Sequence, residues 1–168
     1  VALKAVGHAV RHKTEAGLVL LGLDGPAQVA DGYRTLRERA GEMLEGVLVE
    51  EMLAGPREFM TGMKRDDAFG TVVAFGLGGV LTEALGDIAL AVAPLDERDV
   101  LELFGSIRAA RLLESFRGQP PVDREELAAV VTVLARIAAD HPHVSEIDVN
   151  PLLLSGGHPV AADALVVL

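Results

Sequence analysis

Short apolar runs rich in valine and leucine recur along the chain and are bounded by glycine. Runs of this length and composition are typical of buried β-strands. They predict strands at 1–6, 17–23, 46–52, 58–64, 71–75, 88–92, 144–154 and 160–168. Because several of these runs follow one another across short turns, the pattern predicts a mainly antiparallel sheet in an α+β fold.

Three stretches between these runs carry an apolar stripe with helical spacing. They predict helices at about 26–44, 97–115 and 123–139. Pro26 opens the first, at a position where a missing N–H does no harm. Asp123, with Glu126 three residues later, has the spacing of a capping box at the start of the third.

Three oxygen-bearing side chains lie within apolar strand sequence near the end of the chain: Asp148, Asn150 and Asp163. Polar groups are costly to bury in a strand unless they have a use. Strand alternation puts Asp148 and Asn150 on one face, and the Gly156-Gly157 turn lets the next strand return Asp163 beside them. Two carboxylates and one amide suit Mg²⁺, which shares its shell with waters and substrate phosphates. The pattern therefore predicts a magnesium site that serves a phosphate-bearing nucleotide.

Two N-terminal residues each have two interpretations. Lys4, within an apolar strand, lies either at a solvated edge or in a site for an anion. His12, between Arg11 and Lys13 in a polar loop, is either solvated or a nucleophile. A neutral imidazole can accept a phosphoryl group, and the flanking cations would stabilise the transferring charge.

Three further features remain open as well. Glu50 and Glu51 follow a strand and are either simply exposed or part of a backbone segment that binds adenine. The glycines of 75–80 form either a tight turn or a phosphate-binding loop, although the lysine of a Walker loop is missing. Glu83 and Asp87, in an otherwise apolar segment, face either a site or solvent.

Length and composition favour one folded domain that spans residues 1–168. Half of the residues are apolar, and the mean hydropathy is +0.34. Such a chain can bury a core. Strand-like sequence begins at the first residue and continues to residue 6, so we expect this chain to be a fragment of a larger multidomain protein.

Charge and cysteine content exclude several classes of function. The net charge is −10 and the cations are scattered, so we expect neither nucleic acid nor an anionic membrane as a partner. The chain contains no cysteine, which excludes disulfides, zinc fingers and thiol catalysis. We expect a cytoplasmic protein, because no signal peptide or membrane-length apolar run is evident.

A series of motifs in a fixed order resembles one known family: the ATP-grasp domain of the NDP-forming acyl-CoA synthetases, related to the beta part of succinyl-CoA synthetase. The motifs cover essentially the whole chain. They are Lys4, His12-Lys13-Thr14, Val49-Glu50-Glu51-Met52, Glu58, Lys64-Arg65-Asp66, Phe75 to Glu83, Arg117-Gly118 with Pro120-Pro121 and Asp123, and Glu146 to Leu152.

This resemblance implies an ATP-grasp fold, expected here without its N-terminal helices, and a role for each motif. The implied cofactors are Mg²⁺ and ATP or ADP. Lys4 would contact phosphates, Glu50, Glu51, Met52 and Leu53 would hold adenine, Glu58 would bind the ribose, and Asn150 and Asp163 would bind Mg²⁺. His12 would relay a phosphoryl group to ADP, and Asp148 would orient its imidazole. The implied partners are CoA-binding alpha-type domains or an alpha-type subunit.

Two departures from the family pattern favour an alternative function. Leu18 replaces the second glycine of a pair, and Ala91 stands where arginine is common. The alternatives are a catalytically silent, nucleotide- or acyl-CoA-sensing domain of a protein acetyltransferase, or an interaction scaffold. The identity of the acyl group, the choice between ADP and GDP, and the homo- or hetero-oligomeric state remain open.

Overall fold

The computed structural model describes residues 1–168 except 8–12, 14–15 and 80. The chain divides into two compact units, Val1–Met52 (unit 1) and Leu53–Leu168 (unit 2). Each unit has a sheet and a hydrophobic core of its own. Among the described residues, no helix combines the length and the apolar content needed to span a bilayer.

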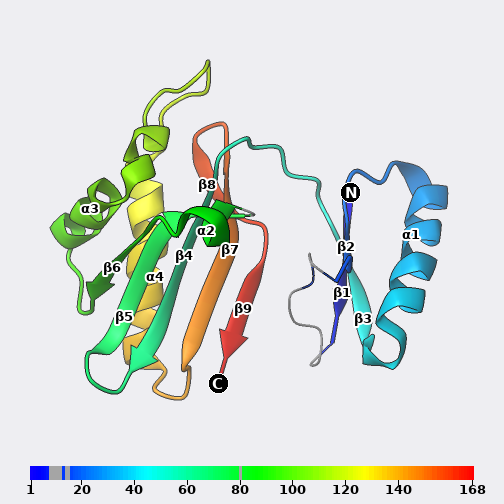
Figure 1. Ribbon diagram of the computed structural model, residues 1–168, viewed down its shortest axis with the longest axis horizontal. Coiled ribbons are helices and arrows are strands. Elements are labelled where there is room, and N and C mark those ends of the chain that lie inside the picture. Colours follow the sequence, from blue (N-terminus) through cyan, green and yellow to red (C-terminus); the bar gives the residue numbers. More distant parts are fainter. Residues whose placement is uncertain (8–12, 14–15, 80) are drawn as a thin grey trace. The chain divides into compact units, whose positions relative to one another are not determined.

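The described part of unit 1 is a three-stranded antiparallel sheet against which one long helix packs (Figure 1). The strand order is β2-β1-β3, so β1 is the central strand. Leu3 and Ala5 of β1 are buried together with Leu36 and Ala40 of the helix. The elements are β1 (Ala2–Val6), β2 (Val19–Leu20), α1 (Gly25–Ala40), the 3-10 helix η1 (Gly41–Met43) and β3 (Gly46–Glu50).

Two elements of unit 1 are shorter than the sequence predicts. The strand expected over 17–23 is reduced to β2, and Gly22, just beyond it, has a φ of +69°. The helix expected to reach residue 44 ends at Ala40, because Gly41 at its C-cap has a φ of +55°. Glycine adopts this left-handed region without the steric cost that other residues incur, which makes it a common helix terminator.

In unit 2 a six-stranded sheet carries helices on one face (Figure 1). The strand order is β6-β5-β4-β7-β8, with β9 also pairing with β7, and each described pairing is antiparallel. The predicted antiparallel α+β fold is therefore confirmed. The strands are β4 (Glu58–Asp66), β5 (Gly70–Leu77), β6 (Ile88–Val92), β7 (Glu146–Ser155), β8 (His158–Ala161) and β9 (Ala164–Val167). The helices are α2 (Leu81–Leu85), α3 (Glu97–Ser106), η2 (Arg108–Leu113) and α4 (Arg124–Asp140).

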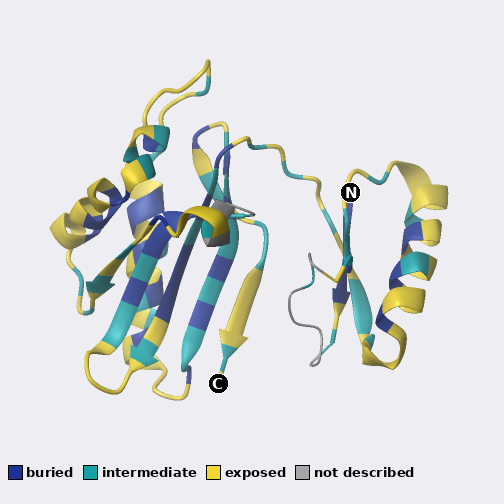
Figure 2. Ribbon diagram, viewed as in Figure 1, coloured by how far each residue is buried: buried dark blue, intermediate teal, exposed yellow. Residues whose placement is uncertain are grey.

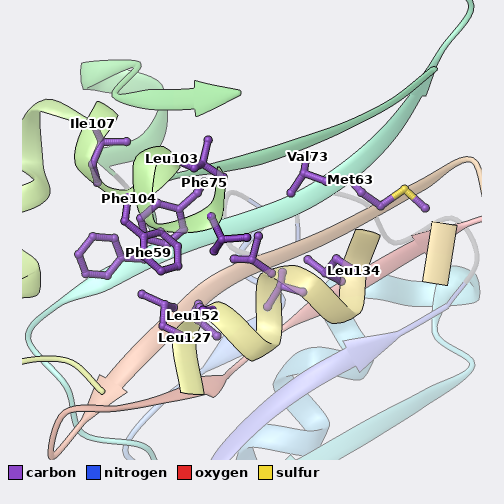
Figure 3. Packing of buried hydrophobic residues seen from close by; sticks show 14 of the residues in the cluster. Phe59, Met63, Val73, Phe75, Leu103, Phe104, Ile107, Leu127, Leu134 and Leu152 are labelled. Atoms are coloured by element: carbon purple, nitrogen blue, oxygen red, sulfur yellow. The ribbon is translucent and has the colours of Figure 1, made fainter. Parts of the chain in front are cut away.

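The core of unit 2 lies between this sheet and helices α3 and α4 (Figure 3). The Phe59 and Phe75 rings stack with their centroids 5.4 Å apart, and the Phe104 ring of α3 lies 4.6 Å from that of Phe75. Ile147 and Val149 of β7 are buried in the same cluster, whereas the residues that alternate with them along the strand are half-buried (Figure 2). Because side chains alternate along a strand, those intervening residues point to the second face of the sheet.

The helix expected over 97–115 is interrupted at Ile107, which has an extended backbone and a buried side chain. The interruption coincides with a cap formed by Asp87. The carboxylate of Asp87 accepts hydrogen bonds from the backbone N–H groups of Arg108 and Ala109, each at 2.8 Å, and so caps η2. Asp87 is only 6% exposed, so both sequence interpretations of it, a site residue or a solvent-facing residue, are wrong.

Replacing Asp87 by alanine should destabilise the protein. Burial alone would raise the pKa of Asp87, but the N–H groups of Arg108 and Ala109 and the Arg108 guanidinium together hold it below its ordinary value. Loss of this cap leaves two part-buried backbone N–H donors without their acceptor, so we expect a loss of about 2 kcal/mol in unfolding free energy. Urea denaturation of the wild type and of Asp87→Ala measures this difference in unfolding free energy. Asp66→Ala removes a carboxylate that also accepts two backbone N–H groups, but in an exposed turn, and should cost less.

The same cap predicts a pH dependence. Because the pKa of Asp87 is lower in the folded chain than in the unfolded chain, its stabilisation is complete above about pH 4 and is lost as the pH falls through the folded pKa. The stability difference between wild type and Asp87→Ala should therefore narrow on acidification. A difference that stays constant between pH 7 and pH 3 would contradict the capping role.

Candidate functional site

The three oxygen-bearing residues singled out near the end of the chain lie together on β7 and in the short connection between β8 and β9. Strands β8 and β9 pair with β7 in one continuous register, which places Asp163 opposite Asn150. The Asn150 N–H donates to the Asp163 carbonyl at 3.2 Å. Since opposite residues of an antiparallel pair point to the same face, Asp148, Asn150 and Asp163 share the second face of the sheet.

The neighbouring strand β4 leaves space beside this cluster. Gly62 lies opposite Asp148, so the β4 position that faces this carboxylate directly carries no side chain. The β4–β7 register shifts between Phe59 and Thr61, where β7 has one residue more than β4. This β-bulge contains Asn150. Bulges of this kind change the direction in which a side chain points and are frequent beside functional sites.

Negative charge gathers around Asp148. Burial, followed by the nearby carboxylates of Glu146 and Asp163, raises the pKa of Asp148 above its ordinary value. The carboxylate of Glu146 is also paired with the Lys64 ammonium at 3.1 Å. A raised carboxyl pKa means that the charged form is disfavoured, so a cation bound here would relieve the repulsion. The electrostatics of this face therefore suit a metal ion or a protonated imidazole.

Glu58, predicted to bind ribose, begins β4 and is half-buried. Gly78, directly after β5, donates its N–H to the Glu58 carbonyl at 2.9 Å, and Gly79 donates its N–H to the Asn150 side-chain oxygen at 2.9 Å. Both N–H groups thus have acceptors within the protein. For Gly78 and Gly79 the phosphate-loop interpretation is therefore wrong, because their donors do not converge on a free position.

In unit 1, Lys4 belongs to the central strand β1, and its side chain is 9% exposed. Its ammonium lies 2.5 Å from a carboxylate oxygen of Glu50 on β3. The interpretation of Lys4 as a solvated edge residue is therefore wrong. Buried charged side chains are normally paired, and Glu50 supplies the carboxylate that pairs with Lys4.

The rest of the predicted nucleotide segment has less structure. Glu51 and Met52 are exposed, Leu53 is half-buried, and the three follow β3 as irregular chain. His12 lies outside the described residues. A hollow of about 560 Å³ on unit 1, between α1 and β3, is lined by none of the predicted site residues.

Arg57 is a structurally important residue that the sequence did not single out. It is 4% exposed, and its guanidinium donates to the carbonyls of Leu112, Glu114 and Pro120 at 2.7–3.1 Å. These bonds attach the connector that precedes α4 to the start of β4, next to Glu58. The one signal in the sequence was a basic residue just before a strand. The sequence does not show that its hydrogen-bond acceptors are backbone carbonyl groups more than fifty residues away.

A second cluster of possible metal ligands consists of Asp123, Glu126 and His158. Asp123 caps α4 by accepting the N–H groups of Glu125 and Glu126, which confirms the predicted helix start. The Glu126 side chain does not make the return bond of a capping box; its carboxylate instead contacts the His158 imidazole at 2.9 Å. This hydrogen bond, followed by the negative charges of Glu126 and Asp123, raises the pKa of His158. Helix capping and a surface ion pair account for this cluster.

A family model of the ATP-grasp domain matches residues 1–168. The chain belongs to the ATP-grasp family. It is 35% identical over 173 residues to the acetate–CoA ligase (ADP-forming) I subunit beta of Pyrococcus furiosus, an alignment that covers 100% of this chain and 75% of that subunit. It is 36% identical over 156 residues to acetate–CoA ligase (ADP-forming) I of Archaeoglobus fulgidus, covering 90% of this chain and 23% of that protein.

A solved structure agrees with this assignment. The dinucleotide-forming acetyl-coenzyme A synthetase 1 of Ca. Korarchaeum cryptofilum, in complex with coenzyme A and Mg-AMPPCP, matches 100% of this ATP-grasp chain and 76% of its own chain, with a TM-score of 0.85 and 32% identity. The phosphohistidine segment of that structure points towards its nucleotide-binding site. The predicted family and fold are therefore confirmed. The relatives carry the predicted ligase names, and the solved structure holds a Mg-nucleotide analogue.

Proposed function

We propose that this ATP-grasp chain is the nucleotide-binding, phosphoryl-transferring part of an ADP-forming acyl-CoA synthetase. The reaction converts acyl-CoA, ADP and phosphate into acid, ATP and CoA, or runs in reverse. The chain spans 75% of the Pyrococcus subunit but only 23% of the Archaeoglobus ligase, so CoA-binding alpha-type domains would supply the remaining steps. The observation that carries the proposal is the grouping of Asp148 and Asn150 of β7 with Asp163, just before β9, on one face of the sheet.

The donor set on this face fits Mg²⁺. Asn150 offers an amide oxygen and Asp163 a carboxylate, the hard oxygen ligands that Mg²⁺ takes alongside water and nucleotide phosphates. Like-charge repulsion at Asp148 would be relieved by a bound cation. When bound, Mg²⁺ would neutralise phosphate charge and orient the nucleotide.

The transfer step depends on the chain's own residues. The phosphorus–nitrogen bond of phosphorylated His12 breaks as a terminal oxygen of ADP forms the new phosphorus–oxygen bond of ATP. Asp148 would accept a hydrogen bond from the protonated ring nitrogen of that histidine, so that the imidazole leaves as a neutral group. Lys4, held by Glu50, would bind phosphate oxygens.

The remaining roles follow from the same proposal. The backbone of Glu50, Glu51, Met52 and Leu53 would hold adenine, and Glu58 would accept hydrogen bonds from ribose hydroxyls. CoA-binding alpha-type domains would be the partner. We also expect this chemistry to take place in the cytoplasm, where ADP and acyl-CoA are available.

The test is ATP formation by the full natural protein that contains this chain. Acyl-CoA, ADP, phosphate and Mg²⁺ are supplied together, and ATP is measured with a luciferase assay. We expect ATP that depends on all four components. A protein that binds Mg-ADP without forming ATP from any short-chain acyl-CoA would favour the silent regulatory function instead.

The structure offers a packing explanation for the two departures that favoured this alternative. Leu18 is 4% exposed in the core of unit 1, and Ala91 packs against the core of unit 2. Apolar side chains at these positions stabilise the two cores, so packing accounts for both residues. Their presence therefore does not by itself argue for loss of activity.

A further inference from the structure

The two glycines after β5 contact both the predicted metal ligand and the predicted ribose ligand of unit 2. Gly79 donates its N–H to the Asn150 side-chain oxygen at 2.9 Å. A Cβ on Gly79 would lie 1.7 Å from a carboxylate oxygen of Glu58, so the bare Cα of Gly79 is packed against that carboxylate. One glycine thus adjoins two side chains that come from different strands.

The local backbone at this turn requires glycine. Gly79 has a φ of +62°, in the left-handed region that side chains with a Cβ rarely adopt. At Gly78 a Cβ would lie 2.1 Å from the Phe59 carbonyl oxygen, which belongs to the backbone of β4. Gly78 also donates its N–H to the Glu58 carbonyl. The turn is therefore fixed to the first residues of β4 at two successive positions.

The hydrogen bond from Gly79 sets the orientation of the Asn150 amide. A backbone N–H can only donate, so the atom that faces it must be the amide oxygen, not the amide nitrogen. An amide oxygen has two lone pairs, of which Gly79 occupies one. The second stays available for a cation. Without this bond the amide could rotate and present its N–H₂ group, which repels cations.

We propose that the Gly78–Gly79 turn is a positioning element that holds the Asn150 amide oxygen and the Glu58 carboxylate in place for Mg-nucleotide. This inference rests on the proposed function, because it assumes that Asn150 binds the metal. Groups that hydrogen-bond to a metal ligand and orient it, without binding the metal themselves, typically contribute 10–100-fold to metal affinity. The turn would act in this way without contacting the metal or the nucleotide itself.

The first test compares Gly79→Ala with Gly70→Ala in the full natural protein. Gly70 lies at the turn between β4 and β5 with a φ of +80°, and nothing lies within 4 Å of a Cβ placed there, so both variants put a side chain on a left-handed backbone. We expect Gly79→Ala to weaken Mg-ADP binding about tenfold, measured by calorimetry, and Gly70→Ala to leave it unchanged. Equal affinities in the two variants would overturn the proposal.

The second test examines the hydrogen bond without any nucleotide. Amide hydrogen exchange of Gly79 is followed by NMR in the wild type and in Asn150→Ala, with Gly70, another turn glycine of unit 2, as internal reference. We expect the Gly79 amide to exchange about tenfold faster in Asn150→Ala, with Gly70 unchanged. An unchanged rate at Gly79 would overturn the positioning role even if Gly79→Ala fails to fold.

The two tests separate this inference from the function on which it rests. If wild-type protein does not bind Mg-ADP but the Gly79 amide responds to Asn150→Ala, the proposed function fails while the hydrogen bond stands. If Mg-ADP binds and the amide does not respond, the function stands and the positioning role fails.

Discussion

Replacing His12 by alanine is expected to reduce ATP formation by about a thousandfold or more in the full natural protein. The proposed relay needs a nitrogen that forms a covalent bond to phosphorus, and alanine offers none. Binding of Mg-ADP should persist, because the proposed metal ligands and Lys4 are unchanged. ATP formation is followed with luciferase, and Mg-ADP affinity is measured by calorimetry on the same sample.

His158→Ala is the matched control for this experiment. His158 lies on β8, 61% of its side chain is exposed, and its contact is the surface ion pair with Glu126. Its loss should leave turnover within a fewfold of wild type. If His12→Ala retained wild-type turnover, the phosphoryl relay would belong to another group. If the same variant lost Mg-ADP binding as well, His12 would act in binding or folding.

Replacing Asp163 by asparagine should weaken Mg-nucleotide binding by about 10–100-fold. The change keeps the size of the side chain but removes the negative charge of Asp163, one of the two proposed metal ligands. Nucleotide affinity measured with excess EDTA should change much less, because the effect acts through the metal. Calorimetric titration of ADP with and without Mg²⁺ separates the two contributions.

The matched control here is Asp67→Asn, in the exposed turn between β4 and β5. It removes the same formal charge away from β7 and β9, so it shows whether net charge alone alters nucleotide affinity. Equal Mg-ADP affinities in Asp163→Asn and Asp67→Asn would contradict the assignment of Asp163. An equal loss with and without Mg²⁺ would place Asp163 against the nucleotide instead of the metal.

Sequence reasoning succeeded where a repeating pattern determines the structure. The alternation along β7 places Ile147 and Val149 in the core, and it leaves Asp148 and Asn150 on the second face. The Gly156-Gly157 turn returns the chain in register, so Asp163 reaches its place opposite Asn150. Local periodicity and turn chemistry are sufficient for this part of the site.

Sequence reasoning failed where a distant partner decides the local structure. The helical pattern over 97–115 continues through Ile107, but the chain breaks there because Asp87, twenty residues upstream, caps a new helix. Lys4 could not be placed because only strand order shows that β1 is central and that Glu50 lies beside it. The protein acceptors of the Gly78 and Gly79 N–H groups likewise belong to other strands.

The most direct test of the central claim is a calorimetric titration of ADP and ATP into the full natural protein, in the presence of Mg²⁺ and again after chelation with EDTA. If this ATP-grasp chain binds nucleotide through a metal on the β7–β9 face, binding should be saturable with Mg²⁺ and should weaken sharply once the metal is removed. Absence of binding with Mg²⁺, or binding of equal strength after chelation, would contradict the claim.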